Sequence, residues 1–271
     1  MLEGLSVQLG EDGSCETVVP DGWGQGRWVF GGLIGALLVR AADSLTPDDR
    51  RLRSLTVGFV GPVTAGSVTL RARVLRAGRG VTHVRAELLQ GDSPEPDQHA
   101  LCAHALLTYG VSRPSSIRLP SVQAPAVPGP EGIADMPAIP GIVPEFLSNF
   151  AVRWTVDSLP FTGSEAKVQG WIRPRFPGSV DSAVLMAVID AWPPPLLSAA
   201  DRPVAVTSLV WQVALSDAFE PTAEGDSPWW LYDAAPAFGG HGYSDVEARL
   251  WDGDGILMAC SRQVYADFSG V

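Results

Sequence analysis

Residues Ser179 to Trp192 read S-V-D-S-A-V-L-M-A-V-I-D-A-W, and this stretch decides the fold. It is apolar without interruption from Ala183 to Ile189. A helix that lacks a polar strip has no face for solvent, so the pattern predicts a helix that is buried nearly all round. Ser179 is suited to cap the start of this helix, and Asp181 is suited to its first turn.

Asp190 stands at the far end of this apolar helix, where the helix dipole is negative. A carboxylate that is placed against both burial and a dipole should have a raised pKa. Groups with shifted pKa values are common at functional sites, so Asp190 is a candidate catalytic residue. The plainer alternative is a carboxylate that lies in water just past the helix end, before Pro193-Pro194-Pro195.

A second apolar stretch, Phe30 to Asp43, predicts another buried helix, and each helix precedes four runs that resemble strands. After the first helix these runs are Arg53–Val60, Ser67–Leu75, Val81–Gln90 and Ala100–Tyr109. After the second they are Val204–Leu215, Pro228–Ala234, Gly242–Trp251 and Ile256–Phe268. Shorter runs precede the helices, at Cys15–Val19, Asn149–Asp157 and Glu165–Arg173. The chain therefore repeats, and a helix that is buried all round requires a sheet curled around it.

Residues 111–145 separate the two repeats. Eight prolines fall between Pro114 and Pro144, which predicts a partly extended linker that crosses the surface. We therefore expect an N-terminal unit at residues 1–110, a linker at 111–145 and a C-terminal unit at 146–271. Both units have the usual size of a domain.

The composition limits the partners of the chain. Its formal net charge is −11, which argues against nucleic acid or an anionic membrane as the main partner. The apolar stretches are too short to span a membrane, and Met1 to Gly10 lacks the features of a secretory signal. Cys15, Cys102 and Cys260 are widely spaced, which indicates reduced thiols and a cytoplasmic protein.

Several other chemistries fit the sequence poorly. There is no G-x-S-x-G motif for a serine esterase, and Gly22–Gly26 does not give a dinucleotide fingerprint. Asp252-Gly253-Asp254-Gly255 resembles part of a calcium loop, but apolar residues follow it, so a hairpin turn is expected. The four histidines lack metal-binding spacing, so we predict no metal and no cofactor. They are His83, His99, His104 and His241; His241 lies in a glycine-rich loop where contact with a ligand stays open.

The order of several motifs resembles the TesB-like double-hotdog acyl-CoA thioesterases over essentially the whole chain. Each motif alone is a weak pattern, and their succession makes the resemblance specific. They are Val29–Gly32 at the first helix, Phe59–Gly66, Leu75–Arg79, the helix that ends in Asp190, Thr207–Leu215, and Trp251–Gly255 running into Ala259–Gln263. The resemblance implies an α+β fold, a double hotdog in which two antiparallel sheets each wrap around a long buried helix.

The resemblance also implies a catalytic set of Asp190, Thr207 and Gln263. The matching positions of the first repeat are Ala41, Ser54 and Leu107, so one site per chain is expected. Ser208 is adjacent to Thr207, and a shift of one residue along a strand would exchange their faces, so the choice between them stays open.

A site of this kind is suited to hydrolysis of a thioester. The carboxylate can accept a proton from water, while the hydroxyl and the amide can hold that water in position. The resemblance implies that the start of the first helix faces the site of the other repeat, so the amides of Gly31, Gly32 and Leu33 are expected to bind the oxyanion.

We therefore predict an acyl-CoA thioesterase that forms a homodimer of double-hotdog chains, because exposed sheet edges are normally paired or covered. The alternatives are a non-catalytic binder of acyl thioesters and, less favoured, a hotdog dehydratase or hydratase, which would carry a histidine near a helix. The acyl chain length, and the choice of CoA or acyl carrier protein as the thiol, stay open.

Overall fold

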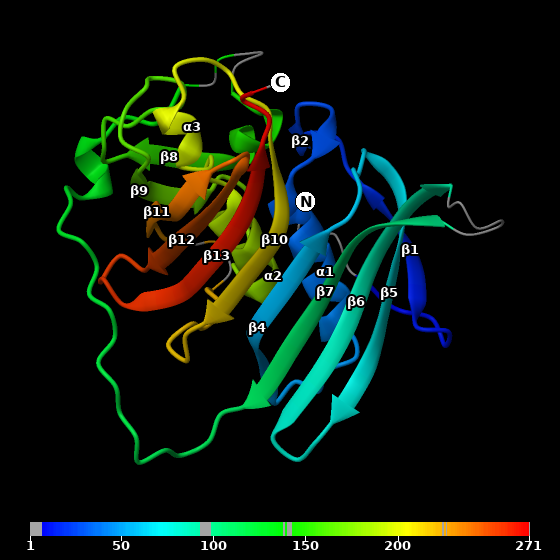
Figure 1. The fold of residues 1–271 in the computed structure, drawn as a ribbon. Helices are drawn as coiled ribbons and strands as arrows, with labels where there is room; N and C mark the ends of the chain where they lie inside the picture. Colours follow the sequence, from blue (N-terminus) through cyan, green and yellow to red (C-terminus); the bar gives the residue numbers. More distant parts are fainter. Residues whose placement is uncertain are drawn as a thin grey trace.

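The computed structural model describes residues 7–92, 99–137, 139, 143–223, 225 and 227–270. Within these residues it contains a continuous antiparallel sheet of eleven strands that curls around two helices (Figure 1). The strands follow the order β1-β5-β6-β7-β4-β10-β13-β12-β11-β9-β8. The two halves of the chain meet where β4 pairs with β10, so each half contributes one side of the sheet.

The elements of the two halves follow the same sequence of helix and strands. The first half contains β1 (Ser14–Val19), β2 (Gly24–Gln25), β3 (Trp28–Val29), α1 (Gly31–Asp43), β4 (Arg50–Phe59), β5 (Gly66–Ala77), β6 (Val81–Asp92) and β7 (His99–Val111). The second half contains β8 (Phe150–Trp154), β9 (Val168–Pro174), α2 (Ser182–Asp190), α3 (Leu196–Ala199), β10 (Val206–Leu215), β11 (Trp230–Gly240), β12 (Tyr243–Trp251) and β13 (Leu257–Asp267). Short 3-10 turns lie at Pro130–Gly132 and Glu145–Asn149.

This architecture confirms the predicted double hotdog and both of its buried helices. The predicted strands differ from the observed ones mainly at their ends, and β11 is the largest difference because it extends to Gly240 instead of ending at Ala234. The sequence analysis did not predict the β2–β3 hairpin or the short helix α3, which begins directly after Pro195.

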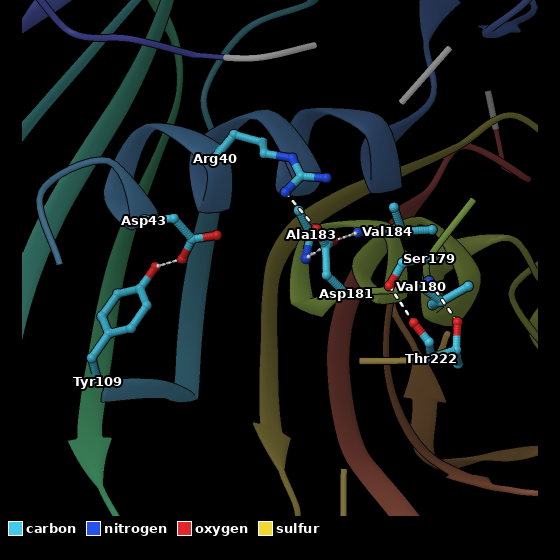
Figure 2. Close-up of polar contacts among 9 residues, drawn as sticks. All are labelled: Arg40, Asp43, Tyr109, Ser179, Val180, Asp181, Ala183, Val184 and Thr222. Atoms are coloured by element: carbon cyan, nitrogen blue, oxygen red, sulfur yellow. Dashed lines mark hydrogen bonds and ion pairs between the residues drawn. The ribbon is translucent and has the colours of Figure 1, made fainter. Parts of the chain in front are cut away.

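The start of α2 differs from the prediction. Asp181, not Ser179, caps this helix, because its side chain accepts hydrogen bonds from the backbone N–H groups of Ala183 and Val184, both at 3.0 Å (Figure 2). The hydroxyl of Ser179 instead donates to the carbonyl oxygen of Thr222 at 2.6 Å. The helix therefore begins at Ser182, with the capping carboxylate at its positive end.

Glycines let α1, α2 and the sheet approach one another closely. A Cβ atom on Gly32 would lie 2.9 Å from the Cα of Ala187, and one on Gly35 would lie 2.7 Å from the Trp211 ring. The start of α1 lies at the end of α2, and Arg40 near the end of α1 pairs with Asp181 at the start of α2, so the helices run antiparallel. Each helix terminus thus faces the opposite terminus of its partner.

The linker crosses the outer face of the second half (Figure 1). The indole N–H of Trp171 donates to the Pro128 carbonyl at 2.8 Å, and that of Trp251 donates to the Val122 carbonyl at 3.0 Å. These bonds fix the linker over a small apolar cluster that includes Leu231. None of the helices in the described part of the chain is long and apolar enough to cross a lipid bilayer.

Candidate active site at the end of helix α2

Three polar side chains from three elements meet at the end of α2. The amide nitrogen of Gln263, on β13, donates to Asp190 Oδ1 at 3.2 Å and to Ser208 Oγ at 2.8 Å. Asp190 is the last residue of α2 and is partly buried, and Gln263 is only 6% exposed. Because β10 and β13 are paired, Ser208 and Gln263 are held on neighbouring strands beneath the helix terminus.

Ser208, and not the predicted Thr207, is the hydroxyl residue of this network. Thr207 is exposed and lies opposite Ala266, whereas Ser208 lies opposite Tyr265. The alternation along β10 is interrupted by a β-bulge between Ser208 and Val210. Simple alternation from the buried Trp211 would bring Thr207 to the inner face, and the extra residue of the bulge brings Ser208 there instead.

The environment of Asp190 raises the pKa of its carboxyl to about 7. Burial is the main cause, since it disfavours the charged form, while the Gln263 amide and the Gly32 backbone N–H act in the opposite direction. Besides burial, the sequence analysis considered the dipole of α2, which opposes a negative charge at this end, but not that of α1. The positive start of α1 also faces this carboxylate and partly offsets that effect.

Gly31 allows the start of α1 to approach the Asp190 carboxylate closely. A Cβ atom at this position would lie 2.8 Å from Asp190 Oδ2 and 3.3 Å from the Phe59 ring. Any larger residue would therefore displace the carboxylate or the ring. The glycine gives room to the carboxylate itself, whereas the sequence analysis expected it to give room to a substrate.

Two of the three predicted oxyanion donors already have partners. The N–H of Gly32 is directed at Asp190, and the N–H of Leu33 donates to the Phe30 carbonyl at 3.2 Å. The third, Gly31, lies beside Asp190 Oδ2. The N-terminal end of α1 therefore interacts with the Asp190 carboxylate itself.

Two tyrosines near Asp190 were missed by the sequence analysis. Tyr232 on β11 and Tyr265 on β13 are each 7% exposed, and burial followed by the charge of Asp190 raises the pKa of both phenols. The Tyr232 ring stacks on Trp192 with centroids 5.3 Å apart, and Trp154 packs edge-on against the same indole at 5.4 Å. Tyr265 could have been found from the sequence, because it lies two residues after Gln263 and hence on the same face of the strand.

The opposite end of the helix pair carries a different set of contacts (Figure 2). Tyr109 donates from its hydroxyl to Asp43 Oδ1 at 2.7 Å, at the end of α1. Arg40 forms an ion pair with Asp181, the residue that caps α2. The polar groups shown at this end are therefore bonded to one another.

Strand register shows which residues correspond between the two ends. Leu107 lies opposite Leu55 as Gln263 lies opposite Trp211, and a bulge follows in each half. Beyond the bulge, Tyr109 lies opposite Leu52 as Tyr265 lies opposite Ser208. The counterpart of Ser208 is therefore Leu52, and the predicted counterpart Ser54 was misplaced by the same bulge. Ala41, the expected counterpart of Asp190, is a fully buried methyl group.

Solved structures share this fold at low sequence identity. A hotdog-fold protein of unknown function from Alicyclobacillus acidocaldarius superimposes with a TM-score of 0.84, at 22% identity over 100% of this chain and 98% of that chain. The acyl-CoA thioesterase II TesB2 of Mycobacterium marinum gives 0.72, at 16% identity over 100% of both chains. The TesB protein of Mycobacterium avium gives 0.71, at 18% identity over 93% of this chain and 92% of that one. Curated protein sequences give no match.

Family models identify both halves of the chain. The model of the acyl-CoA thioesterase N-terminal domain matches residues 19–110, and that of the C-terminal domain matches residues 125–266. The second match alone covers more than half of the 271 residues. The range that matches the C-terminal domain includes the residues of the candidate site, Asp190, Ser208 and Gln263. The chain therefore belongs to the TesB-like acyl-CoA thioesterases, a family of thioester hydrolases.

Proposed function

We propose that this chain hydrolyses an acyl-CoA thioester to a free acid and CoA with a water molecule held by Asp190, Gln263 and Ser208. The observation that carries this proposal is the bonded network in which one amide joins a carboxylate of raised pKa to a hydroxyl. Ser208 takes the place that the sequence analysis gave to Thr207.

The carboxylate is the base in this reaction. As the water oxygen bonds to the thioester carbon, one water proton passes to Asp190 and the carbonyl π electrons move to oxygen. The tetrahedral intermediate then re-forms the carbonyl and expels the CoA thiolate, which takes the proton from Asp190. A pKa near 7 suits this role, because a general base works best when its pKa lies close to the working pH.

Gln263 and Ser208 orient the water. The two N–H bonds of the Gln263 amide are used by Asp190 and Ser208, which leaves its carbonyl oxygen and the Ser208 O–H free to hold a water molecule. Both side chains come from paired strands, so their positions relative to Asp190 are rigid. A water fixed in this way needs little further ordering before it attacks.

The described histidines support a hydrolase over a dehydratase. His83 lies on the outer face of the sheet, 3.2 Å from the Thr108 hydroxyl, and His104 packs against Gly58. His241 adopts a left-handed backbone conformation with φ of 54° in the loop between β11 and β12. The side chain of His99 lies outside the described residues.

We also propose that the chain forms a homodimer in the cytoplasm. The sheet ends in the two edge strands β1 and β8, and its outer face exposes Leu106, Phe238 and Tyr243, each more than half exposed. Open sheet edges and exposed apolar side chains on the sheet favour association. Reduced cysteines fit the cytoplasm, and the three thiols here are unpaired. Light scattering at micromolar concentration would give a monomeric mass if the dimer does not form.

Release of free thiol tests the function directly. The panel consists of short, medium, long and aromatic acyl-CoAs, with the matching acyl carrier protein thioesters as a second series. We expect hydrolysis of at least one acyl-CoA class and strong loss of that activity in Asp190→Asn. A folded wild-type protein that releases no thiol from any member of the panel would overturn the proposal.

A further inference from the structure

Two buried residues on the inner face of β13 and β12 carry hydroxyl groups that have no hydrogen-bond partner among the described residues. Tyr265 and Ser244 lie directly opposite each other on these strands and are 7% and 4% exposed. In the described part of the structure, neither hydroxyl makes a hydrogen bond to another residue. The Ser244 hydroxyl is buried and unpaired, which is costly, and such groups commonly mark a place that a ligand or water fills. The Tyr265 hydroxyl is not among the buried unpaired atoms, so a ligand or water can reach it.

Tyr265 is joined to the catalytic network by the sheet. It pairs with Ser208 across β10 and β13, and it lies two residues from Gln263 on the same face. The negative charge of Asp190 contributes to raising the pKa of its phenol, which shows that the two groups are electrostatic neighbours. The Tyr265 hydroxyl therefore belongs to the wall of the Asp190 site.

The proposed hydrolysis needs a donor that the backbone at α1 does not fully supply. Attack on the thioester moves negative charge to the carbonyl oxygen, and donors at that point are among the strongest contributions to catalysis. The N–H groups of Gly32 and Leu33 are directed at Asp190 and Phe30. A neutral hydroxyl group nearby is suited to the task, and the raised pKa of Tyr265 keeps its proton in place at neutral pH.

We propose that the hydroxyl of Tyr265 donates a hydrogen bond to the thioester carbonyl oxygen and stabilises the oxyanion that forms as water attacks. Tyr265 keeps its proton throughout, so the bonds made and broken are those of the hydrolysis already described. This assignment rests on the proposed function and adds to it a residue that contacts the reacting atoms.

The corresponding tyrosine of the other half provides an internal comparison. Tyr109 occupies the same register position, opposite Leu52 in place of Ser208, and its hydroxyl is bonded to Asp43 at 2.7 Å. The same side chain is thus a structural donor at one end of the helix pair and an unpartnered donor at the other.

The test compares Tyr265→Phe with Tyr109→Phe on the best acyl-CoA substrate. Loss of an oxyanion donor should lower kcat by roughly 10- to 1000-fold with little change in KM, because the bond is strongest in the transition state. The melting temperature of Tyr265→Phe should stay nearly level, since the change removes a hydroxyl that bonds to no other described residue. Tyr109→Phe should show the reverse, with lower melting temperature and nearly unchanged kcat. Tyr232→Phe, which removes another phenol near Asp190, is compared on the same substrate.

Each result separates this proposal from the function on which it rests. Wild-type turnover in a folded Tyr265→Phe, while Asp190→Asn has lost activity, would overturn the role of Tyr265 and leave the hydrolase intact. A rise in KM without a fall in kcat, or a fall in kcat in Tyr232→Phe alone, would also overturn it. Absence of hydrolysis in the wild type would instead overturn the proposed function.

Discussion

The two ends of the helix pair are built from corresponding residues and differ in which polar groups remain available. At the Asp190 end, a carboxylate, an amide and a serine hydroxyl form a network beside the start of α1. At the other end, Asp181 occupies the start of α2 and pairs with Arg40, while Asp43 binds Tyr109. Carboxylates thus lie at both ends. At the end opposite Asp190, they are occupied by a helix cap, an ion pair and a hydrogen bond from a hydroxyl.

The difference shows how a repeated fold can hold a single site. Burial raises the pKa of Asp190 to about 7 and that of Asp43 to about 6, so burial alone does not distinguish the two ends. The distinction comes from the neighbouring strands, where Gln263 and Ser208 stand in place of Leu107 and Leu52. Apolar side chains can neither hold a water nor relay a proton, so we expect the first half to serve as scaffold.

The largest expected difference between the ends comes from removing each carboxylate charge. Asp190→Asn keeps the shape but cannot accept a proton, so thiol release should fall by roughly 10²- to 10⁴-fold. Asp43→Asn can still accept the bond from Tyr109 and should keep turnover within about twofold, because its carboxylate takes no part in the chemistry. Steady-state kinetics on one acyl-CoA gives both values, and equal losses would contradict a single site.

Thermal stability serves as the control for these substitutions. The folded pKa of Asp190 is raised from 3.8 to about 7, so the folded state binds the proton more tightly and stability falls as pH rises through this range. The Asn variant lacks this penalty and should be more stable above pH 7, by roughly 1–3 kcal/mol, with the advantage fading towards pH 4. Loss of stability at pH 8 with turnover intact would make Asp190 a structural residue.

An intermediate effect is expected on the paired strands. Gln263→Ala should lower turnover by roughly 10- to 1000-fold, as loss of one positioned polar group often does. Leu107→Met, at the corresponding position of the first half, is close in volume and should leave turnover nearly unchanged. Comparison of kcat in the two variants checks the asymmetry, and a fall in both by the same factor would contradict it. A conservative change of Ser54 should also leave turnover nearly unchanged, since Ser54 does not correspond to any residue of the Asp190 network.

The smallest effect separates the two neighbouring hydroxyls of β10. Ser208→Ala should lower kcat by roughly five- to thirtyfold, because it removes one hydrogen bond of about 1–2 kcal/mol from the network. Thr207→Ala should change little, since Thr207 is exposed on the other face. Turnover that depends on Thr207 and not on Ser208 would show that the bulge does not persist in the working enzyme.

Much of this arrangement can be predicted from sequence, and the exceptions have physical causes. The unbroken apolar runs of α1 and α2 specify buried helices, and a repeated pattern of helix and strands specifies the double hotdog. Asp190 is a candidate from the sequence because its carboxylate stands against both burial and the helix dipole, whereas Gln263 was named through the resemblance to the family. The sequence left the choice between Thr207 and Ser208 open, because a β-bulge exchanges the faces of a strand without leaving a strong sequence signal.

Contacts between distant segments were the other feature that the sequence did not reveal. The ion pair of Arg40 with Asp181 and the approach of Gly32 to Asp190 depend on the antiparallel packing of two helices that lie far apart in the chain. The same packing directs the α1 amides to the carboxylate, whereas the sequence alone suggested a role as oxyanion donors. Tyr265 was overlooked because a tyrosine on a core strand normally serves only to fill space.

The pH dependence of kcat/KM for thiol release tests the role of Asp190 most directly, because it reports the ionisation of the free enzyme. The kcat/KM of the wild type should fall as the pH decreases, in a single acid limb with an apparent pKa near 7, because Asp190 becomes protonated there. The residual activity of Asp190→Asn should lack that limb, while Asp43→Asn should retain it. A limb that persists in Asp190→Asn, or that disappears in Asp43→Asn, would contradict catalysis by Asp190 and place the essential group elsewhere.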